Sequence, residues 1–250
     1  MLAMVGLGYS VDPTQKGMEA IARAKAVYLD SYTSPVSEDL KGLVESKIGR
    51  EVRLAERRFI EEGGLINEAE NQDIALLVVG DPFFATTHVS MMLEARQRGI
   101  DTAIIGNSSI FDAVGRTGLS PYKFGRTVTL SYWREKYRPT SPLELIEKNR
   151  GIGLHTLALL DVAEDLGPMD AKKGLSQIRE MEKALGRKVV DELFVVSRAG
   201  FEDEKITFGK VEELEKADLG RPLFCFIVPG EMTKLELEFA RALARFIGSR

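Results

Sequence analysis

The stretch from Gly80 to His88 gathers an unusual number of chemically useful residue types within the 250-residue chain. It combines a glycine turn, the carboxylate of Asp81, two phenylalanines, two threonine hydroxyls and one of only two histidines. It follows the apolar run from Asp73 to Val79, which predicts a strand of a parallel sheet that is buried on both faces. Loops that follow such strands are where open α/β sheets bind ligands, so we interpret this stretch as part of a binding site.

The same stretch also has a purely structural interpretation. In it, Asp81 or Thr86 caps the helix predicted for Thr86 to Arg98, Pro82 lies in a first helical turn, and the phenylalanines are core residues. Capping does not need all of these residue types together. The combination therefore favours a binding function.

Gly6-Leu7-Gly8 closes the first predicted strand, and Asp30 ends the next strand roughly twenty residues later, as in dinucleotide-binding loops. Val11, however, stands where the third glycine of that fingerprint belongs. The following helix also begins only after Pro13, too late to direct its N-terminus at a pyrophosphate. These departures favour another nucleoside-like ligand over NAD, and a simple tight turn is the structural alternative.

Gly106-Asn107-Ser108-Ser109-Ile110 forms a further polar loop, after the predicted strand from Asp101 to Ile105. Ser108 or Ser109 alone is an ordinary helix cap. The loops at 6–8, 80–88 and 106–110 all follow strands of one predicted parallel sheet, so they meet at its carboxyl edge. This convergence favours a ligand-binding cleft.

Cysteine and histidine are scarce, which excludes several kinds of site. Cys225 is the single cysteine, and His88 and His155 are the only histidines, so a structural zinc centre or an internal disulfide cannot form. Cys225 is predicted to be a buried thiol, and His155 a hydrogen-bonded core residue. The chain shows no EF-hand spacing, nucleophile and base set or P-loop, so we predict no metal site.

The overall composition predicts a globular protein. Hydrophobic residues make up 44% and charged residues 29% of the chain, close to the averages for soluble domains. A formal net charge of -4 argues against direct binding to nucleic acid. Neither a bilayer-length apolar run nor a signal peptide with a basic flank is evident, so we expect a cytoplasmic protein that does not bind membranes.

The elements that position these loops predict two α/β domains. Residues 1–115 alternate strands and helices, as a mostly parallel sheet requires, whereas residues 116–250 include strands with brief connections, which predicts a mixed sheet. The predicted N-terminal strands are Met1 to Leu7, Ala26 to Asp30, Glu51 to Leu54, Asp73 to Val79 and Asp101 to Ile105, with helices at Thr14 to Lys25, Ser37 to Ile48, Thr86 to Arg98 and a helix end at Asn67 to Gln72. The predicted C-terminal strands are Thr127 to Tyr132, Gly153 to Asp161, Lys188 to Ser197, Lys205 to Phe208 and Leu223 to Val228, with helices at Leu143 to Asn149, Lys172 to Leu185 and Glu231 to Ile247.

A series of short motifs runs along nearly the whole chain: Gly6-Leu7-Gly8, Tyr32-Thr33-Ser34, Gly80-Asp81-Pro82 through His88, Ser109-Ile110 with Ala113-Val114-Gly115, Tyr122-Lys123-Phe124-Gly125, Pro139-Thr140-Ser141, Gly153-Leu154-His155-Thr156, Arg198-Ala199-Gly200 and Val228-Pro229-Gly230. With these motifs in this order, the chain resembles the diphthine synthase family, in the tetrapyrrole-methylase-like class of S-adenosylmethionine methyltransferases. The glycine pair and Gly-Asp-Pro mark the class. Ala85-Thr86-Thr87-His88 and Tyr122-Lys123-Phe124-Gly125 narrow the resemblance to the family.

The resemblance implies a homodimeric methyltransferase that holds S-adenosylmethionine in a cleft between its two domains and releases S-adenosylhomocysteine. The implied reaction is successive methylation of the amino group of the carboxy-aminopropyl-modified histidine of translation elongation factor 2, a step of diphthamide biosynthesis. A tetrapyrrole or ribosomal-RNA methyltransferase is the alternative within the class. Outside it, the alternatives are an NAD-linked oxidoreductase and a non-catalytic module that binds the elongation factor.

The resemblance also implies a set of residues that contact the cofactor: Tyr9, Asp81, Phe84, Ser109, Ile110, Leu160, Ala199 and Phe224. Tyr9 stands where a leucine is usual and Phe224 where a histidine is common, so only a backbone hydrogen bond is expected at position 224. Because the sulfonium already activates the methyl group, we predict that no residue is catalytic and that Asp81 places the cofactor.

Overall fold

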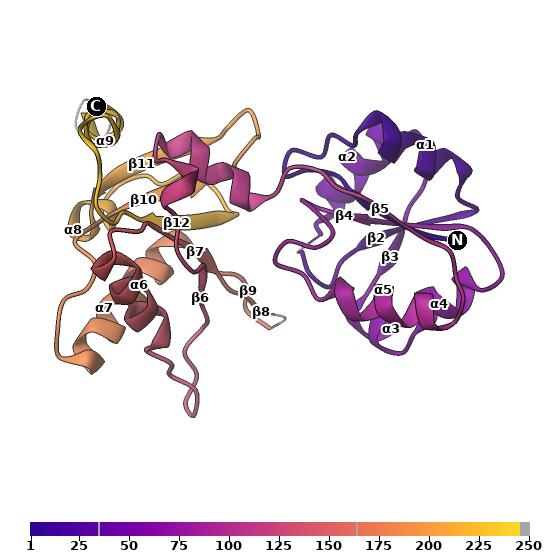
Figure 1. Cartoon of the computed structure of the whole chain (residues 1–250), viewed down its shortest axis with the longest axis horizontal. Coiled ribbons are helices and arrows are strands. Elements are labelled where there is room, and N and C mark those ends of the chain that lie inside the picture. Colours follow the sequence, from indigo (N-terminus) through magenta and orange to yellow (C-terminus); the bar gives the residue numbers. More distant parts are fainter. Residues whose placement is uncertain (35, 164, 246–250) are drawn as a thin grey trace. The chain divides into compact units, whose positions relative to one another are not determined.

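The computed structural model describes residues 1–34, 36–163 and 165–245. The chain divides into two compact units, Met1–Ser109 and Ile110–Arg250 (Figure 1). The domain division was predicted after residue 115. The difference corresponds to most of η1, a 3-10 helix at Ile110–Thr117, which belongs to the second unit.

The first unit contains a parallel sheet, as predicted, and its five strands lie in the order β3-β2-β4-β1-β5. Its strands are β1 (Leu2–Gly6), β2 (Ala26–Asp30), β3 (Arg53–Ala55), β4 (Ile74–Val78) and β5 (Thr102–Ile105). Every residue of β1 and β4 is buried, because helices cover both faces of the sheet. The strand order places β1 between β4 and β5, so the loops that follow these strands are neighbours.

Helices α1 and α2 lie on one face of this sheet, and α3, α4 and α5 lie on the other (Figure 1). Their bounds are α1 (Gln15–Arg23), α2 (Glu38–Ile48), α3 (Arg57–Glu61), α4 (Gly64–Ala69) and α5 (His88–Gln97). Thr14 and Ser37 cap the first two, because their hydroxyls accept the N–H groups of Gly17 and Leu40, each at 3.1 Å. The short helix α3 was not predicted, since five residues carry too little periodic pattern.

The second unit contains a mixed sheet in the order β11-β10-β12-β7-β6, in which only β6 and β7 pair in parallel. The strands are β6 (Val128–Leu130), β7 (Thr156–Leu160), β10 (Glu192–Ser197), β11 (Lys205–Lys210) and β12 (Phe224–Val228). This confirms the predicted mixed sheet. Residues 188–191 were predicted as strand but precede β10, because the N–H groups of Val189 and Val190 donate to Glu182 Oε1 at 2.7 and 2.8 Å.

Helices α6 (Ser141–Gly151) and α7 (Ala171–Leu185) contribute to the hydrophobic core of the second unit, and α9 (Lys234–Arg245) lies against β11. The predicted final helix extended to residue 247, and its last two residues lie outside the described part of the chain. Short elements missed by the sequence analysis are the hairpin of β8 (Val162–Ala163) and β9 (Gly167–Pro168), helix α8 (Val211–Leu214) and the 3-10 turn η2 (Pro121–Lys123). Within the described residues, no helix is long and apolar enough to span a membrane.

Candidate functional site

The loops that follow β1 and β4 are joined through two glycines at the carboxyl edge of the first sheet. Gly8 N donates to Gly80 O at 3.1 Å, and Gly80 N donates to Gly8 O at 3.0 Å. Their φ angles are 67° and 85°, in the left-handed region that glycine adopts without a Cβ clash. A Cβ on Gly6 would lie 2.8 Å from Gly80 O. Gly6 and Gly8, which suggested a nucleotide-binding loop in the sequence, are therefore required for the close contact between the loops after β1 and β4.

Asn107 connects this pair of loops to the loop after β5. Its side-chain amide donates to Gly6 O at 3.0 Å and to Asp12 O at 2.9 Å, while its Oδ1 accepts from Ser108 N at 2.8 Å. Its backbone N–H donates to Asp81 Oδ2 at 3.1 Å. Asn107 lies in the polar loop predicted at 106–110 but was not itself predicted to be a site residue. The available signal was its residue type, since an amide that both donates and accepts can bridge several backbone segments.

Asp81 bridges two loops and does not cap a helix. Its Oδ1 accepts from Phe83 N at 2.9 Å, its Oδ2 accepts from Asn107 N, and the residue is buried. Helix α5 begins after Thr87, and Thr86 instead donates its hydroxyl to Pro82 O. The capping interpretation of Asp81 and Thr86 is therefore wrong.

His88 and Asp30 form a fully buried pair in the first unit. His88 Nε2 lies 3.4 Å from Asp30 Oδ2, and Nδ1 lies 3.0 Å from the carbonyl oxygen of Pro82. Burial raises the pKa of Asp30, but the contacts with His88, Thr33 and Tyr32 N outweigh burial and leave that pKa below its ordinary value. The NAD alternative depended on Asp30 as the residue that binds the ribose. Because the Asp30 carboxylate has no exposed surface, it cannot bind a ribose, which argues against this alternative.

Strained backbone also marks the loops that carry the predicted cofactor contacts. Among the described residues, the non-glycine residues with positive φ are Val11 at 59°, Ala85 at 58° and Arg198 at 50°. They lie in the same loops as Tyr9, Phe84 and Ala199, respectively. Such a conformation costs roughly 1–3 kcal/mol per residue and tends to occur at ligand sites. Because non-glycine residues rarely adopt a positive φ, no sequence pattern indicated this conformation.

The first unit holds Tyr9, Asp81, Phe84 and Ser109 of the predicted cofactor contacts, and all of them lie in the joined loops. Phe84 is 50% exposed, so its interpretation as a core residue is wrong. Ser109 is buried. The structure brings these four residues to one edge of the first sheet, and their contact with a cofactor stays a prediction.

The second unit holds Ile110, Leu160, Ala199 and Phe224, and three of these four share one edge of its sheet. Leu160 ends β7, Phe224 begins β12, and Ala199 follows the end of β10. Strand β12 pairs antiparallel with both neighbours, with Ser197 opposite Phe224, so the three strand ends coincide. All three residues are buried, and Ile110 begins η1. Their role likewise stays a prediction.

Known proteins are similar to this chain over nearly its whole length. A sequence model of the family described as Tetrapyrrole (Corrin/Porphyrin) Methylases matches residues 1–215. A diphthine synthase from Methanocaldococcus jannaschii is 36% identical over 99% of this chain and 100% of that protein. This chain belongs to the diphthine synthase branch of the tetrapyrrole methylase family. It is a methyltransferase, as predicted.

Other members of the family also match over most of both chains. A diphthine methyl ester synthase from Saccharomyces cerevisiae is 36% identical over 96% of this chain and 88% of that protein. The crystal structure of a diphthine synthase has a TM-score of 0.86 and 34% identity, and the match covers 98% of this chain and 96% of that one. The family therefore includes relatives named for two different products, a distinction that matters for the assay below.

The scarce cysteine and the second histidine of this methyltransferase are structural, as predicted. Cys225 is fully buried in β12, and burial raises the pKa of its thiol to about 12. His155 is also fully buried, and its Nδ1 accepts from Gly230 N at 2.9 Å. Among the residues described, no group of three or more His, Cys, Asp or Glu side chains could hold a metal ion.

Proposed function

We propose that this methyltransferase uses S-adenosylmethionine to methylate, in successive steps, the amino group of the carboxy-aminopropyl-modified histidine of translation elongation factor 2. The observation that carries the proposal is the 36% identity to a diphthine synthase over 99% of this chain. The proposed product is diphthine, an intermediate of diphthamide biosynthesis. The proposed place of action is the cytoplasm, and the proposed assembly is a homodimer.

The proposed cofactor site consists of Tyr9, Asp81, Phe84 and Ser109 in the first unit and Ile110, Leu160, Ala199 and Phe224 in the second. The loops of the first unit suit such a ligand because hydrogen bonds between them fix their backbone before the ligand binds. Each Asp81 oxygen accepts one backbone N–H and retains a further lone pair for a ligand donor. Half-exposed Phe84 offers an aromatic surface beside it.

Bound S-adenosylmethionine supplies a methyl group that its sulfonium has already activated, so the protein needs mainly to orient the amine and exclude water. The attacking amine must be neutral, and a cationic cofactor nearby disfavours its protonated form. Solvent can take the proton after substrate docking. Asp81 is bonded to two backbone N–H groups and acts as a positioning residue.

Substitution of Asp81 tests this assignment. In Asp81→Asn, an NH2 group replaces one carboxylate oxygen. That group cannot accept a hydrogen bond from the backbone N–H that it faces, so one of the two bonds, to Phe83 N or to Asn107 N, is lost. We expect a higher KM for S-adenosylmethionine with a smaller change in kcat. If turnover disappeared while cofactor affinity stayed unchanged, Asp81 would be acting on the reaction itself.

The deciding experiment incubates the purified protein with S-adenosylmethionine and elongation factor 2 that carries the carboxy-aminopropyl-modified histidine. Mass spectrometry of the modified peptide should show successive methyl additions. Mild alkali then distinguishes the two products for which the relatives are named, because it removes an ester methyl and leaves N-methyl groups in place. A porphyrinogen and ribosomal RNA serve as controls. Methylation of either control, with none of the elongation factor, would refute the proposal.

A further inference from the structure

His88 and Asp30 form a buried pair that the proposed mechanism does not use. Asp30 ends β2, and His88 begins α5, directly after the loop that follows β4. Strands β2 and β4 are neighbours in the first sheet, so the pair connects two loops at its carboxyl edge. How the ring is protonated therefore affects how these loops are held.

Both ring nitrogens of His88 face acceptor atoms. Nδ1 lies 3.0 Å from the carbonyl oxygen of Pro82, and Nε2 lies 3.4 Å from Asp30 Oδ2. A carbonyl oxygen can only accept, so Nδ1 must carry a proton. In a neutral ring, Nε2 would then be a bare acceptor turned toward a buried carboxylate. Nε2 has no hydrogen-bond partner among the described residues, so an ion pair with Asp30 is the contact that offsets its burial.

Asp30 does not carry the proton in place of the ring. Its Oδ1 accepts from Tyr32 N at 2.9 Å, and its Oδ2 accepts from the hydroxyl of Thr33. Thr33 N also donates to Oδ1 at 3.3 Å. Such donors favour the ionised form, and although burial raises the pKa of Asp30, that pKa lies below its ordinary value. The proton between the two side chains therefore belongs to the ring.

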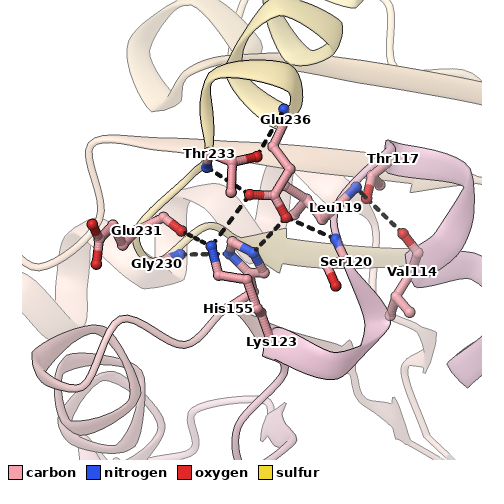
Figure 2. A network of polar contacts seen from close by, with 10 residues as sticks. All are labelled: Val114, Thr117, Leu119, Ser120, Lys123, His155, Gly230, Glu231, Thr233 and Glu236. Atoms are coloured by element: carbon pink, nitrogen blue, oxygen red, sulfur yellow. Dashed lines mark hydrogen bonds and ion pairs between the residues drawn. The ribbon is translucent and has the colours of Figure 1, made fainter.

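His155 has the opposite arrangement in the second unit (Figure 2). It is also fully buried, and its Nε2 also faces a buried carboxylate, that of Glu236, at 3.4 Å. Its Nδ1, however, accepts from Gly230 N at 2.9 Å, so this nitrogen carries no proton. Burial lowers the pKa of His155, and Glu236 only partly offsets this. The two histidines thus differ in the group that faces Nδ1, which is a carbonyl oxygen for His88 and an N–H group for His155.

Asp30 is the charged group that His88 faces from the elements around it. No other carboxylate of the described residues is in ion-pair contact with the ring. Asp81, in the preceding loop, turns both oxygens to backbone N–H groups. The charged residues of α5 itself are Glu94 and Arg96, more than one helical turn further along. The charge on His88 is therefore balanced by Asp30.

The contact with Pro82 closes the loop after β4. Pro82 O accepts from the Thr86 hydroxyl and from His88 Nδ1, so the segment from 82 to 88 is closed on one carbonyl group. Ala85, in the middle of this segment, has a φ of 58°, a conformation that persists only where the surroundings hold it. The ring thus helps to hold the segment that carries the predicted cofactor contacts at positions 81 and 84.

We propose that His88 is a positioning residue of the cofactor site, which carries a proton on each ring nitrogen and ties the loop after β4 to the carboxylate that ends β2. The ring is buried, so it acts through the loop and not on the cofactor itself. This inference rests on the proposed function, because the ligand is S-adenosylmethionine. Loss of the second ring proton removes the ion pair and weakens cofactor binding.

The charge on the ring can be measured in the wild-type protein. With ¹⁵N-labelled histidine, NMR correlation spectra of the ring protons and nitrogens distinguish a doubly protonated ring from either neutral form. At pH 7 we expect a doubly protonated ring for His88 and a neutral ring with its proton on Nε2 for His155. These are the only two histidines, and the His155 ring lies 5.3 Å from the ring of Phe124, so contacts with Phe124 assign the signals.

Two substitutions of similar shape separate the two contacts of the ring. His88→Asn retains a donor where Nδ1 lies and loses the charge that faces Asp30. His88→Gln retains a donor near Nε2 and loses the bond to Pro82. Isothermal titration with S-adenosylmethionine should show weaker binding for both, by roughly tenfold for His88→Gln. At saturating cofactor, kcat should change little, as expected for a residue that acts through cofactor affinity.

Asp30→Asn tests the dependence on charge. Without the negative charge, His88 should appear in the same spectrum as a neutral ring with its proton on Nδ1. Wild-type affinity for S-adenosylmethionine should fall as the pH rises above neutrality, because the ring then loses its second proton, and Asp30→Asn should lack this dependence. Glu68→Gln is the matched control, because Glu68 accepts from the hydroxyl of Tyr28, another β2 residue, and it should behave as wild type.

The outcomes separate this inference from the proposed function. A neutral His88 ring in the wild-type spectrum at pH 7 would overturn it, and so would His88 variants that bind S-adenosylmethionine as tightly as wild type. If the variants do not fold, the wild-type spectrum and the pH dependence of wild-type affinity decide. If wild type does not bind S-adenosylmethionine, the proposed function and the positioning role both fall, while the spectrum still decides the charge of the ring.

Discussion

Replacing Asn107 by alanine removes three side-chain hydrogen bonds, of which two join the loop after β5 to the loop after β1 and the third, from Ser108 N, lies within the loop after β5. Each such bond contributes a net 0.5–1.5 kcal/mol or so, and the bond to Asp12 O lies in an exposed position. We therefore expect the free energy of unfolding to fall by about 2–3 kcal/mol. Because these loops carry Tyr9 and Ser109, and the backbone of Asn107 bonds to Asp81 in the loop after β4, we also expect weaker binding of S-adenosylmethionine.

The isosteric variant Asn107→Asp sharpens this prediction. It keeps the acceptor that faces Ser108 N, but it turns the donating amide into an oxygen that faces the carbonyl oxygens of Gly6 and Asp12. It also adds a negative charge near Asp81, whose Oδ2 accepts from Asn107 N. At neutral pH the aspartate variant should therefore be less stable than the alanine variant, although it has nearly the shape of the natural residue.

Urea unfolding and isothermal titration with S-adenosylmethionine measure the two effects separately. The predicted order of stability and of affinity is wild type, then Asn107→Ala, then Asn107→Asp. Acidification should narrow the gap between the two variants, because a protonated aspartate carries no charge and offers one donor. If Asn107→Asp matched wild type in both measurements, the amide would not be what holds these loops.

Further predictions concern the crowded glycine, the buried carboxylate and the cysteine. Gly106→Ala should raise KM for S-adenosylmethionine, because its Cβ would lie 2.8 Å from Asp81 Oδ2, whereas Gly115→Ala, with open space around it, should not. Burial raises the pKa of Glu236, but hydrogen bonds from Ser120 N and Thr233 outweigh burial and lower that pKa to about 2. The ionised carboxylate therefore stabilises the fold above about pH 4.5, and this stabilisation should be lost as the pH falls toward 2. Acid titration of unfolding should show this loss in wild type and a smaller one in Glu236→Gln. Cys225 should react with a thiol reagent only after unfolding, because it is fully buried and burial raises its pKa.

Local patterns were sufficient to predict the strands and the edge of the first sheet where the loops meet. The continuous apolar run before Gly80 predicted a strand buried on both faces, and β4 is such a strand. Parallel pairing then requires the loops after β1, β4 and β5 to lie at one edge of the sheet, independently of the contacts that their side chains make. That Tyr9, Asp81 and Ser109 lie at one edge of the first sheet could therefore be expected from parallel pairing alone.

Which atoms fix those loops could not be read from the same patterns, because the deciding contacts join residues far apart in sequence. Asn107 bonds to Gly6 O across 101 positions, and Ser120 N bonds to Glu236 across 116. In the sequence, Asp81 has all the features of a helix cap, and its actual partner, the N–H of Asn107, appears only once β4 and β5 are placed on either side of β1. Thr233 and Glu236 show the opposite case, since residues at this three-residue spacing form a local capping box, yet the same carboxylate also accepts from Ser120 N and Lys123. A local motif thus identifies the residue that organises a site, while the fold decides which distant segments that residue holds.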